Sequence, residues 1–213
     1  MTRAQTKERN RRALLEAALQ VVSRDGYRAR LEEIAERAEL TTGAIYSLFG
    51  SKSGLMVALV TDYLRPHYAE IEQEISAEMD LLEAVDAFAR YYWRSCDAPD
   101  ALSGLSLQIT LLDMAVHDPE TGSRLAASVG GQENHLVTLF TGRAHHGDVI
   151  TPYEAKRLVT ALRALFVGLN QGVLLGLAHG VDEQYFVDTA RALASHLALV
   201  DPDADTPEPG GPK

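Results

Sequence analysis

The stretch Leu31–Lys52, LEEIAERAELTTGAIYSLFGSK, decides the fold of this 213-residue chain. Its first half carries apolar residues at helical spacing and therefore predicts a short helix: Leu31, Ile34, Ala35 and Ala38. Thr41 can cap a second helix, in which Ile45, Leu48 and Phe49 recur on one side. Two short helices joined by a tight turn indicate either an ordinary helix–helix corner or a helix-turn-helix, whose second helix enters a DNA major groove.

The residues around this turn resemble the DNA-binding segment of the TetR family of transcriptional regulators. The resemblance covers residues 11–60 in detail and rests on Thr42-Gly43-Ala44-Ile45-Tyr46, Phe49, Ser51-Lys52 and Leu55, preceded by Leu14, Ala17, Ala18, Leu19, Gly26-Tyr27, Ile34-Ala35 and Ala38. Beyond that range it is one of layout and length. It implies an all-α fold: an N-terminal three-helix helix-turn-helix DNA-binding domain plus a C-terminal helical ligand-binding and dimerisation domain.

The chain departs from the family pattern at three places. Arg30 replaces the usual Thr or Ser before the second helix and removes a capping hydroxyl, which is typically worth about 1 kcal/mol. Glu39 occupies a turn position that is usually glycine, and it is strained if the backbone there is left-handed. Ser53-Gly54 replaces an acidic pair, so the next helix starts with weaker compensation of its dipole.

Eight residues are predicted to contact DNA. Lys52 lies in the first turn after the recognition helix, where an ammonium and a helix N-terminus both favour a phosphate. Tyr46 faces outward; the resemblance implies a phosphate contact for its hydroxyl, and the alternative is a wedge between helices. Thr42, Gly43 and Ala44 have short side chains, so the backbone of the second helix can approach base edges. The full set is Arg30, Thr41, Thr42, Gly43, Ala44, Tyr46, Ser47 and Lys52.

The charge of the chain is unevenly divided. The total is −10, but residues 1–65 hold eleven Lys/Arg against eight Asp/Glu, and the remainder holds nine against twenty-two. A basic arm over residues 1–12 on an acidic body suits an N-terminal contact with the DNA backbone or minor groove. A single cysteine, Cys96, excludes an internal disulfide and fits a reducing cytoplasm; we see no apolar region of a secretory signal.

The chain is predicted to divide into a DNA-binding domain over 1–65, a helical regulatory and dimerisation domain over 66–200 and a disordered, Pro/Gly-rich tail over 201–213. A first helix is expected over about 7–24 and a connecting helix over 51–64, after which Pro66 either starts the next helix or kinks this one. No strand is predicted. The expected helices of the body are 67–78, 81–97, 100–117, 120–144, 152–180 and 183–199.

Small residues recur every four positions along the predicted helix 152–180: Ala164, Gly168, Gly172, Gly176 and Gly180. Each interior glycine costs about 1 kcal/mol of helix propensity, so a close approach by a partner helix or a ligand is expected to compensate. Polar residues within the segment, among them Arg163 and His179, argue against a membrane span. The resemblance implies a homodimer built from the helices at 152–180 and 183–199.

A small-molecule pocket is expected within the helical body, because the resemblance places one there. The candidate ligand-binding residues are Trp93, Gln108, Asp113, Met114, His135, Phe140, Phe166 and Asn170, and for each the alternative is core packing or surface exposure. Asp113 and His117 form a possible pair of metal ligands without a third, so no metal or other cofactor is predicted. The sequence has no phosphate-binding loop, dinucleotide fingerprint or nucleophile elbow, and no enzymatic activity is expected.

These features predict a ligand-responsive transcriptional regulator. As a homodimer it would bind double-stranded DNA at a palindromic operator, act as a repressor and be released by a small-molecule effector. The alternative is a helical small-molecule-binding or partner-binding protein without DNA binding.

Overall fold

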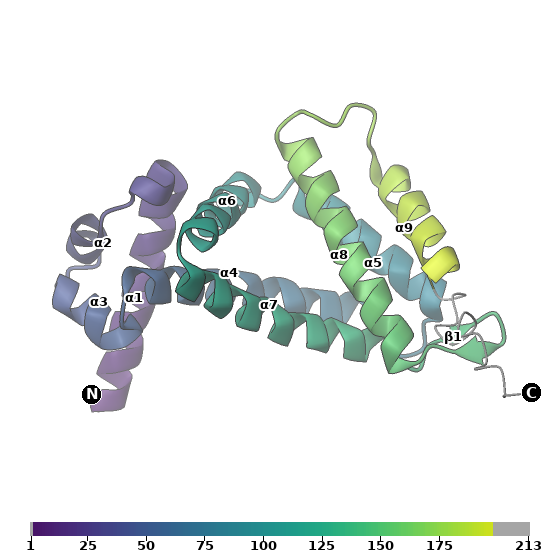
Figure 1. The fold of residues 1–213 in the computed structure, drawn as a ribbon, viewed down its shortest axis with the longest axis horizontal. Coiled ribbons are helices and arrows are strands. Elements are labelled where there is room, and N and C mark those ends of the chain that lie inside the picture. Colours follow the sequence, from purple (N-terminus) through teal and green to yellow (C-terminus); the bar gives the residue numbers. More distant parts are fainter. Residues whose placement is uncertain (1, 198–213) are drawn as a thin grey trace, which may run out of the picture.

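The computed structural model describes residues 2–197, apart from the side chains of Tyr27, Leu64, Arg65 and Leu197. Within this range the chain is helical except for one short hairpin, in agreement with the predicted all-α class (Figure 1). The elements are α1 Arg3–Asp25, η1 Gly26–Arg28, α2 Leu31–Arg37, α3 Thr42–Phe49, α4 Lys52–Glu74, α5 Leu81–Ser95, α6 Ala101–His117, α7 Pro119–Phe140, β1 Ala144–His145, β2 Asp148–Val149, α8 Pro152–Leu174 and α9 Glu183–Leu197. The predicted tail at 201–213 lies outside the described residues.

The first helix begins at Arg3, four residues before the predicted start. Thr2 caps it: the Thr2 hydroxyl accepts a hydrogen bond from the Gln5 amide (3.2 Å), and the Gln5 side chain accepts one from the Thr2 amide (2.7 Å). Most of the predicted basic arm is therefore helical. Gly26 ends the helix with a φ of +57°, a value that glycine adopts readily.

α4 corrects the predicted break near residue 65. The chain does not form separate helices over 51–64 and 67–78, because one helix runs from Lys52 to Glu74 with Pro66 inside it. α4 and α7 run together from the helix-turn-helix end towards the hairpin (Figure 1), and the Thr61 and Ser128 hydroxyls join them by a 2.8 Å hydrogen bond. The N-terminal helices are thus connected to the body through one continuous helix, α4.

The core of the body is aromatic. Phe88, Phe140, Phe166 and Phe186 are fully buried, and they come from α5, α7, α8 and α9. The Phe88 ring lies 5.6 Å from that of Phe140 and 5.4 Å from that of Phe166, in the tilted arrangement that aromatic pairs favour. Asp86 of α5 adds a two-pronged ion pair with Arg191 of α9 (2.5 and 2.6 Å). These contacts fix α5, α8 and α9 as one bundle.

The hairpin β1–β2 was not predicted, and the helix expected over 120–144 ends at Phe140. Three residues of positive φ make the necessary turns: Gly142 (+79°), His146 (+50°) and Gly147 (+93°). The buried guanidinium of Arg143 donates to the carbonyls of Leu139 (2.6 Å), Ser76 (2.9 Å) and Met79 (2.6 Å). One arginine therefore joins the end of α7 to the loop between α4 and α5.

The predicted helix 152–180 also ends early, at Leu174. Gly176 and Gly180 take positive φ values of +66° and +71° in the following loop, so the row of small residues is not one helical face. A Cβ at Gly172 would lie 2.9 Å from that of Ala178, because this loop folds back on the helix. Part of the expected close approach therefore comes from the same chain.

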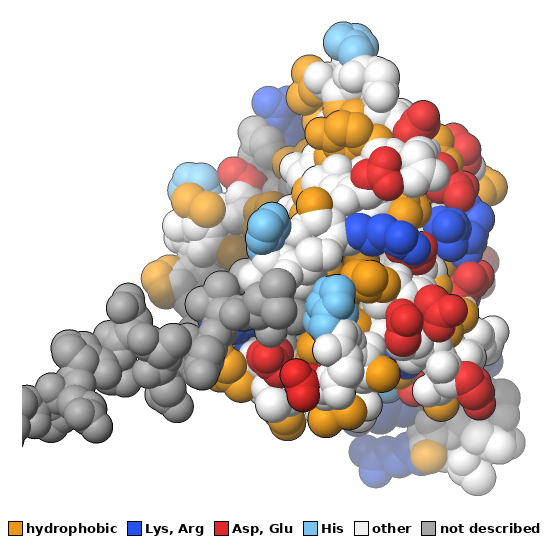
Figure 2. Space-filling view, turned by 90° about the vertical axis from the view of Figure 1, so that its right-hand side faces the viewer, with side chains coloured by type: hydrophobic (Ala, Val, Ile, Leu, Met, Phe, Trp, Pro, Cys, Tyr) orange, Lys and Arg blue, Asp and Glu red, His pale blue; other side chains and the backbone are white. Residues whose placement is uncertain are grey.

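Within residues 2–197 no single helix is long and apolar enough to cross a membrane, although the bent pair α3–α4 passes that test of length and composition jointly. The apolar side chains of this pair include Ile45, Leu55 and Met56, which are buried in the N-terminal core. Figure 2 shows the end of the molecule opposite the helix-turn-helix, where acidic, basic and apolar side chains are intermixed. The basic excess of the sequence belongs to the first 65 residues.

Candidate nucleic-acid interface and internal cavity

The turn between α2 and α3 has the geometry of a helix C-cap with a left-handed residue. Glu39 has a φ of +55°. Its amide donates to the Glu36 carbonyl (3.0 Å), and the Leu40 amide donates to the Ala35 carbonyl (2.8 Å). This is the hydrogen-bond pattern of a Schellman motif, in which glycine is the usual residue at the Glu39 position. The strain expected from Glu39 is present, and the turn nevertheless forms.

α3 presents a short, mostly uncharged surface. The Thr41 hydroxyl caps it by accepting from the Ala44 amide (3.3 Å), and Ile45 is buried beneath. Thr41, Gly43, Tyr46 and Ser47 are exposed, whereas Thr42 and Ala44 are half-buried. The Tyr46 side chain is 55% exposed, so it does not wedge between helices. A Cβ added to Gly43 would meet only the Thr41 hydroxyl at 3.6 Å, so folding alone does not require glycine there.

The junction of α3 and α4 explains why Gly54 stands in place of an acidic residue. A Cβ at Gly54 would lie 2.0 Å from the Phe49 carbonyl oxygen, a contact that no side chain tolerates. Ser51 caps α4 by accepting from the Gly54 amide (3.0 Å). The Lys52 ammonium donates to the Ala29 carbonyl (2.6 Å), which ties this junction to the segment before α2. Lys52 therefore braces the helix-turn-helix, in addition to its predicted contact with a phosphate.

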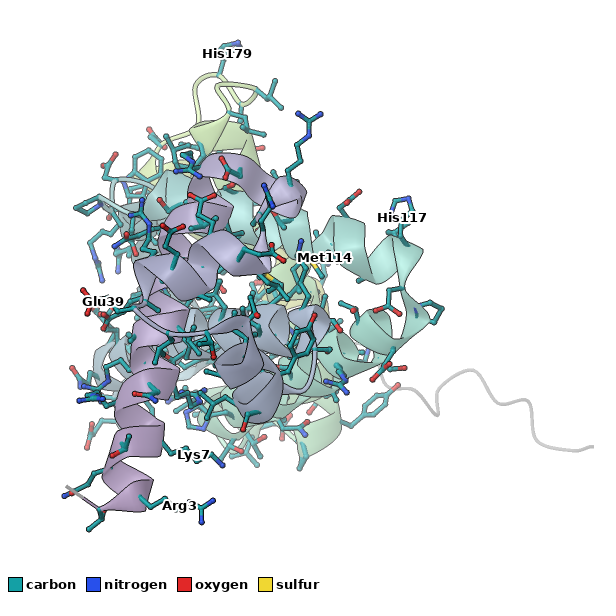
Figure 3. The ribbon with its side chains drawn as sticks, turned by 90° about the vertical axis from the view of Figure 1, so that its left-hand side faces the viewer. Arg3, Lys7, Glu39, Met114, His117 and His179 are labelled. Atoms are coloured by element: carbon teal, nitrogen blue, oxygen red, sulfur yellow. The ribbon has the colours of Figure 1, made fainter. Side chains whose placement is uncertain are left out.

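The other basic residues of the N-terminal helices differ in their availability. Arg24 is held by Asp25 and Glu33, and these hydrogen bonds raise its pKa further. Arg37 donates to the Gln20 side chain (2.6 Å), while Arg30 is exposed and only 3.8 Å from Glu32. Arg3 and Lys7, four residues apart, project from the same side of α1 at its N-terminal end (Figure 3). Arg3 and Lys7 therefore place two positive charges at the N-terminal end of α1.

A cavity of about 370 Å³ lies among α4, α5, α6, α7 and α8. Its size is within the range of small-molecule sites. Aliphatic side chains supply much of the wall, and polar groups enter from every side. The residues that line it are Val60, Tyr63, His67, Tyr68, Ile71, Tyr91, Tyr92, Ser95, Ala98, Asp100, Ala101, Gly104, Leu105, Leu107, Gln108, Leu111, Leu112, Leu125, Val129, Gln132, Arg163, Val167 and Asn170.

Tyrosine and histidine side chains of α4 and α5 form one wall of the cavity. The Tyr91 hydroxyl donates to the Glu70 carboxylate (3.0 Å) and lies 2.8 Å from His67 Nδ1. The Tyr63 hydroxyl donates to the Asp100 carbonyl (3.4 Å), and its ring lies 5.2 Å from that of His67. Burial, with Asp100 beside Tyr63 and Glu70 beside Tyr91, raises the pKa of both phenols well above the ordinary value, so both stay neutral hydroxyls.

Two of the eight predicted ligand residues, Gln108 and Asn170, line this cavity. The Asn170 amide donates to Ser95 (3.4 Å) and Cys96 (3.3 Å), which satisfies part of its demand for partners. Phe140 and Phe166 do not line it, because they are fully buried in the aromatic core. Trp93 packs 5.6 Å from Phe186 instead.

The remaining three predicted ligand residues also lie elsewhere. Met114 packs against the N-terminal core. The Asp113 side chain is 49% exposed and pairs with His117, and the His135 side chain is 42% exposed and lies 3.3 Å from Glu72. The sequence analysis missed Tyr63, His67 and Tyr68. Their spacing places Tyr63 and His67 on one face of a helix, but Pro66 suggested a helix boundary between them.

The wall of the cavity is shared with the core of the N-terminal helices. Val60 of α4 and Leu107 and Leu111 of α6 line the cavity and also belong to the buried cluster that contains Leu14, Ile34 and Ile45. α6 therefore packs against the helix-turn-helix domain, although it follows the predicted boundary at residue 65. These three side chains therefore belong both to the cavity wall and to the N-terminal core.

In the described part of the chain, no group of three or more His, Cys, Asp or Glu side chains lies close enough together to hold a metal ion.

The N-terminal part of the chain is similar to known regulatory proteins. Residues 14–59 match the family described as bacterial regulatory proteins, tetR family. Over 95 residues the chain is 28% identical to the HTH-type transcriptional regulator HbdR of Aromatoleum sp. (strain CIB), which is 44% of this chain and 40% of HbdR. The match thus spans about two fifths of the length of that relative.

The whole fold is similar to that of solved structures. GusR of Salmonella enterica superposes with a TM-score of 0.64 at 16% identity, covering 89% of this chain and 95% of GusR. A transcriptional regulator from Rhodococcus sp. Rha1 superposes with a TM-score of 0.61 at 16% identity, covering 88% of this chain and 95% of that protein. A protein from Saccharomonospora viridis, solved in complex with choline, gives 0.60 at 18% identity, with 87% and 95% covered.

Proposed function

Because the chain belongs to the TetR family of bacterial regulatory proteins, we propose that it is a ligand-responsive, DNA-binding transcriptional regulator. It binds a palindromic operator in the cytoplasm as a homodimer, represses transcription and is released by a small molecule in the cavity. The function divides along the chain: residues 1–65 hold the helices that contact DNA, and residues 66–200 hold the interface with the second protomer and most of the effector cavity, to which Val60 and Tyr63 also contribute.

One observation carries this proposal: Val60, Leu107 and Leu111 have the cavity on one side and the core of the helix-turn-helix domain on the other. A ligand changes operator affinity only if it binds the DNA-competent and DNA-incompetent arrangements with different affinities. Side chains that belong to both regions provide such a difference, because filling the cavity displaces residues on which the N-terminal helices pack. The choline complex of the similar fold supports a small molecule as occupant.

In the proposed homodimer, each protomer contributes one recognition helix, α3. Two copies of α3 about 34–36 Å apart would read successive major grooves of a palindrome. We assign the interface to α8 and α9. Exposed apolar side chains at the loop between them and at the start of α9 support this assignment: Leu175, Leu177 and Tyr185. In addition, Gly168 on α8 is exposed, and a Cβ there would contact nothing within the protomer.

The proposal is tested by fluorescence anisotropy against DNA that flanks the protein's own gene, across a salt series. Tight binding that weakens steeply with salt is expected, since phosphate contacts release counterions. Tyr46→Phe, which removes one exposed hydroxyl, should weaken binding and leave thermal unfolding unchanged. Lys52→Ala should lower the salt slope by about 1, but its unfolding must be followed because Lys52 also holds Ala29. Absence of binding to any fragment, including a randomised pool, would favour the ligand-binding protein without DNA binding.

A further inference from the structure

Aliphatic and polar side chains both line the cavity, so its occupant is amphipathic. The aliphatic side chains include Ile71 of α4, Leu105 of α6 and Leu125 of α7. At one end of the cavity Tyr63 and His67 of α4 face Tyr91 of α5, with the Tyr63 and His67 rings 5.2 Å apart and the His67 and Tyr91 rings 6.4 Å apart. Aromatic faces and hydroxyl oxygens gathered in this way are the groups that surround cationic ligands.

The charges around that end are predominantly negative. A second hollow adjoins the cavity at His67 and Tyr91, and Glu70, Glu74 and Arg94 line it. Glu74 is neutralised by Arg94 at 2.7 Å. The Glu70 carboxylate accepts a hydrogen bond from the Tyr91 hydroxyl, and Asp100 lies beside Tyr63, whose hydroxyl donates to the Asp100 carbonyl. Among the side chains that the structure describes, neither Glu70 nor Asp100 takes part in an ion pair.

The guanidinium on the cavity wall, that of Arg163, is already held in an ion pair. Arg163 enters from α8, and its guanidinium is bound by the Glu133 carboxylate at 2.9 Å. Lys156 lies 3.2 Å from the same carboxylate, which the Thr160 hydroxyl also contacts. Arg163 is therefore engaged in a network between α7 and α8, whereas Glu70 and Asp100 are left with neutral partners.

From this arrangement we infer that the cavity binds an organic cation: an ammonium nitrogen carried on an apolar body. The inference rests on the proposed function and names the chemical class of its effector. The cationic nitrogen lies against Tyr63 and Tyr91, where Glu70 and Asp100 balance its charge. The apolar body fills the space lined by the aliphatic residues. The carboxylates of Glu70 and Asp100 also raise the local concentration of cations and lower that of anions.

The test uses three probes of similar shape and different charge: benzyltrimethylammonium, phenylmethanesulfonate and the neutral phenylmethanesulfonamide. Binding to the full-length protein is measured by titration calorimetry at low salt. The cation is expected to bind about tenfold more tightly than the other two, since ring faces and carboxylates both favour it. Tighter binding of the sulfonate, which would indicate Arg163 as the anchor, overturns the inference; so does the absence of binding by all three probes.

Glu70→Gln supplies the matched variant, because it preserves shape and removes only charge at an exposed position. It should weaken binding of the cation about threefold to tenfold and leave the neutral probe unaffected. The control is Glu72→Gln on the same helix, where the carboxylate faces His135 and does not line the cavity. Equal behaviour of the two variants overturns the inference.

Operator affinity of the same preparations, measured without probe, separates the two proposals. DNA binding without cation binding overturns the inference and leaves the proposed function. Cation binding without DNA binding overturns the proposed function and supports the inferred charge of the cavity.

Discussion

Replacement of Gly43 by alanine separates the folding of the recognition helix from its approach to DNA. Gly43 is the second residue of α3, with its helical backbone at negative φ. The added Cβ would lie 3.6 Å from the Thr41 hydroxyl, which is an ordinary contact. Alanine is favoured over glycine inside a helix by about 1 kcal/mol, and the gain is smaller in the first turn. The free energy of unfolding should therefore stay the same or rise by up to about 1 kcal/mol.

Operator affinity should change in the opposite direction. Gly43 is exposed on the face that carries Tyr46 and Ser47, where a missing side chain lets the backbone reach base edges. A methyl group there should separate helix and DNA and weaken binding about tenfold, or by about 1.4 kcal/mol. Anisotropy titration and urea unfolding of the same preparation measure both quantities.

Gly131→Ala is the matched control. Gly131 lies exposed within α7, and a Cβ there would contact nothing within 4 Å, so the stability gain should be at least as large as that of Gly43→Ala while operator affinity stays unchanged. Unchanged operator affinity in Gly43→Ala would refute the reasoning, because the first turn of α3 would then lie away from the bases.

Three further predictions follow from single residues. Glu39→Gly should raise the free energy of unfolding by about 0.5–1 kcal/mol in urea titration, because the φ of +55° no longer strains a side chain; Glu39→Ala keeps the strain, and an equal gain from it would contradict this explanation. Burial, together with the neighbouring His146, lowers the pKa of His145, whose Nε2 has no hydrogen-bond partner among the described residues, so the neutral form is favoured by folding. The contribution of His145 to the free energy of unfolding should therefore be fully present above pH 6.5 and decline as the pH falls below it. In thermal unfolding at several pH values, His145→Gln should flatten this decline, whereas His146→Asn should keep it. Identical curves for the wild type and His145→Gln would refute the assignment. Gly168→Ala should stabilise an isolated protomer by about 1 kcal/mol but raise the dissociation constant of a dimer built on α8, and sedimentation equilibrium that shows an unchanged dimer would place the interface elsewhere.

The helix-turn-helix could be predicted from the sequence because its signals are local. The capping hydroxyl of Thr41, the apolar positions Ile34 and Ile45 and the turn at Glu39 all lie within a few residues of the contacts they make. The breaks within the body were less predictable. Pro66 is tolerated inside α4, and α7 and α8 end before their sequence patterns do, where glycines of positive φ begin the next turn.

The cavity could not be predicted in the same way, because tertiary packing decides which polar or aromatic residues face a space. Phe166 and Asn170 are four residues apart on α8, yet Phe166 is buried in the core and Asn170 lines the cavity. Tyr92, between the two environments, stacks on Phe166 with ring centroids 4.8 Å apart and also lines the cavity. Periodicity identifies such a face, but it does not show whether a ring or a hollow lies opposite.

The shared wall sets an energetic condition on any release mechanism. To convert a population that is 99% DNA-competent into one that is 99% incompetent, an effector must prefer the second state by about 5.5 kcal/mol. Displacement of Val60, Leu107 and Leu111 can contribute, since each is packed in the N-terminal core as well as against the cavity. Gly104 adds a further connection: a Cβ there would lie 2.3 Å from the Tyr63 hydroxyl, so α6 and the cavity-lining tyrosine of α4 interlock closely. An effector that displaces Tyr63 therefore acts at the contact between α4 and α6, the two helices on which the helix-turn-helix domain packs.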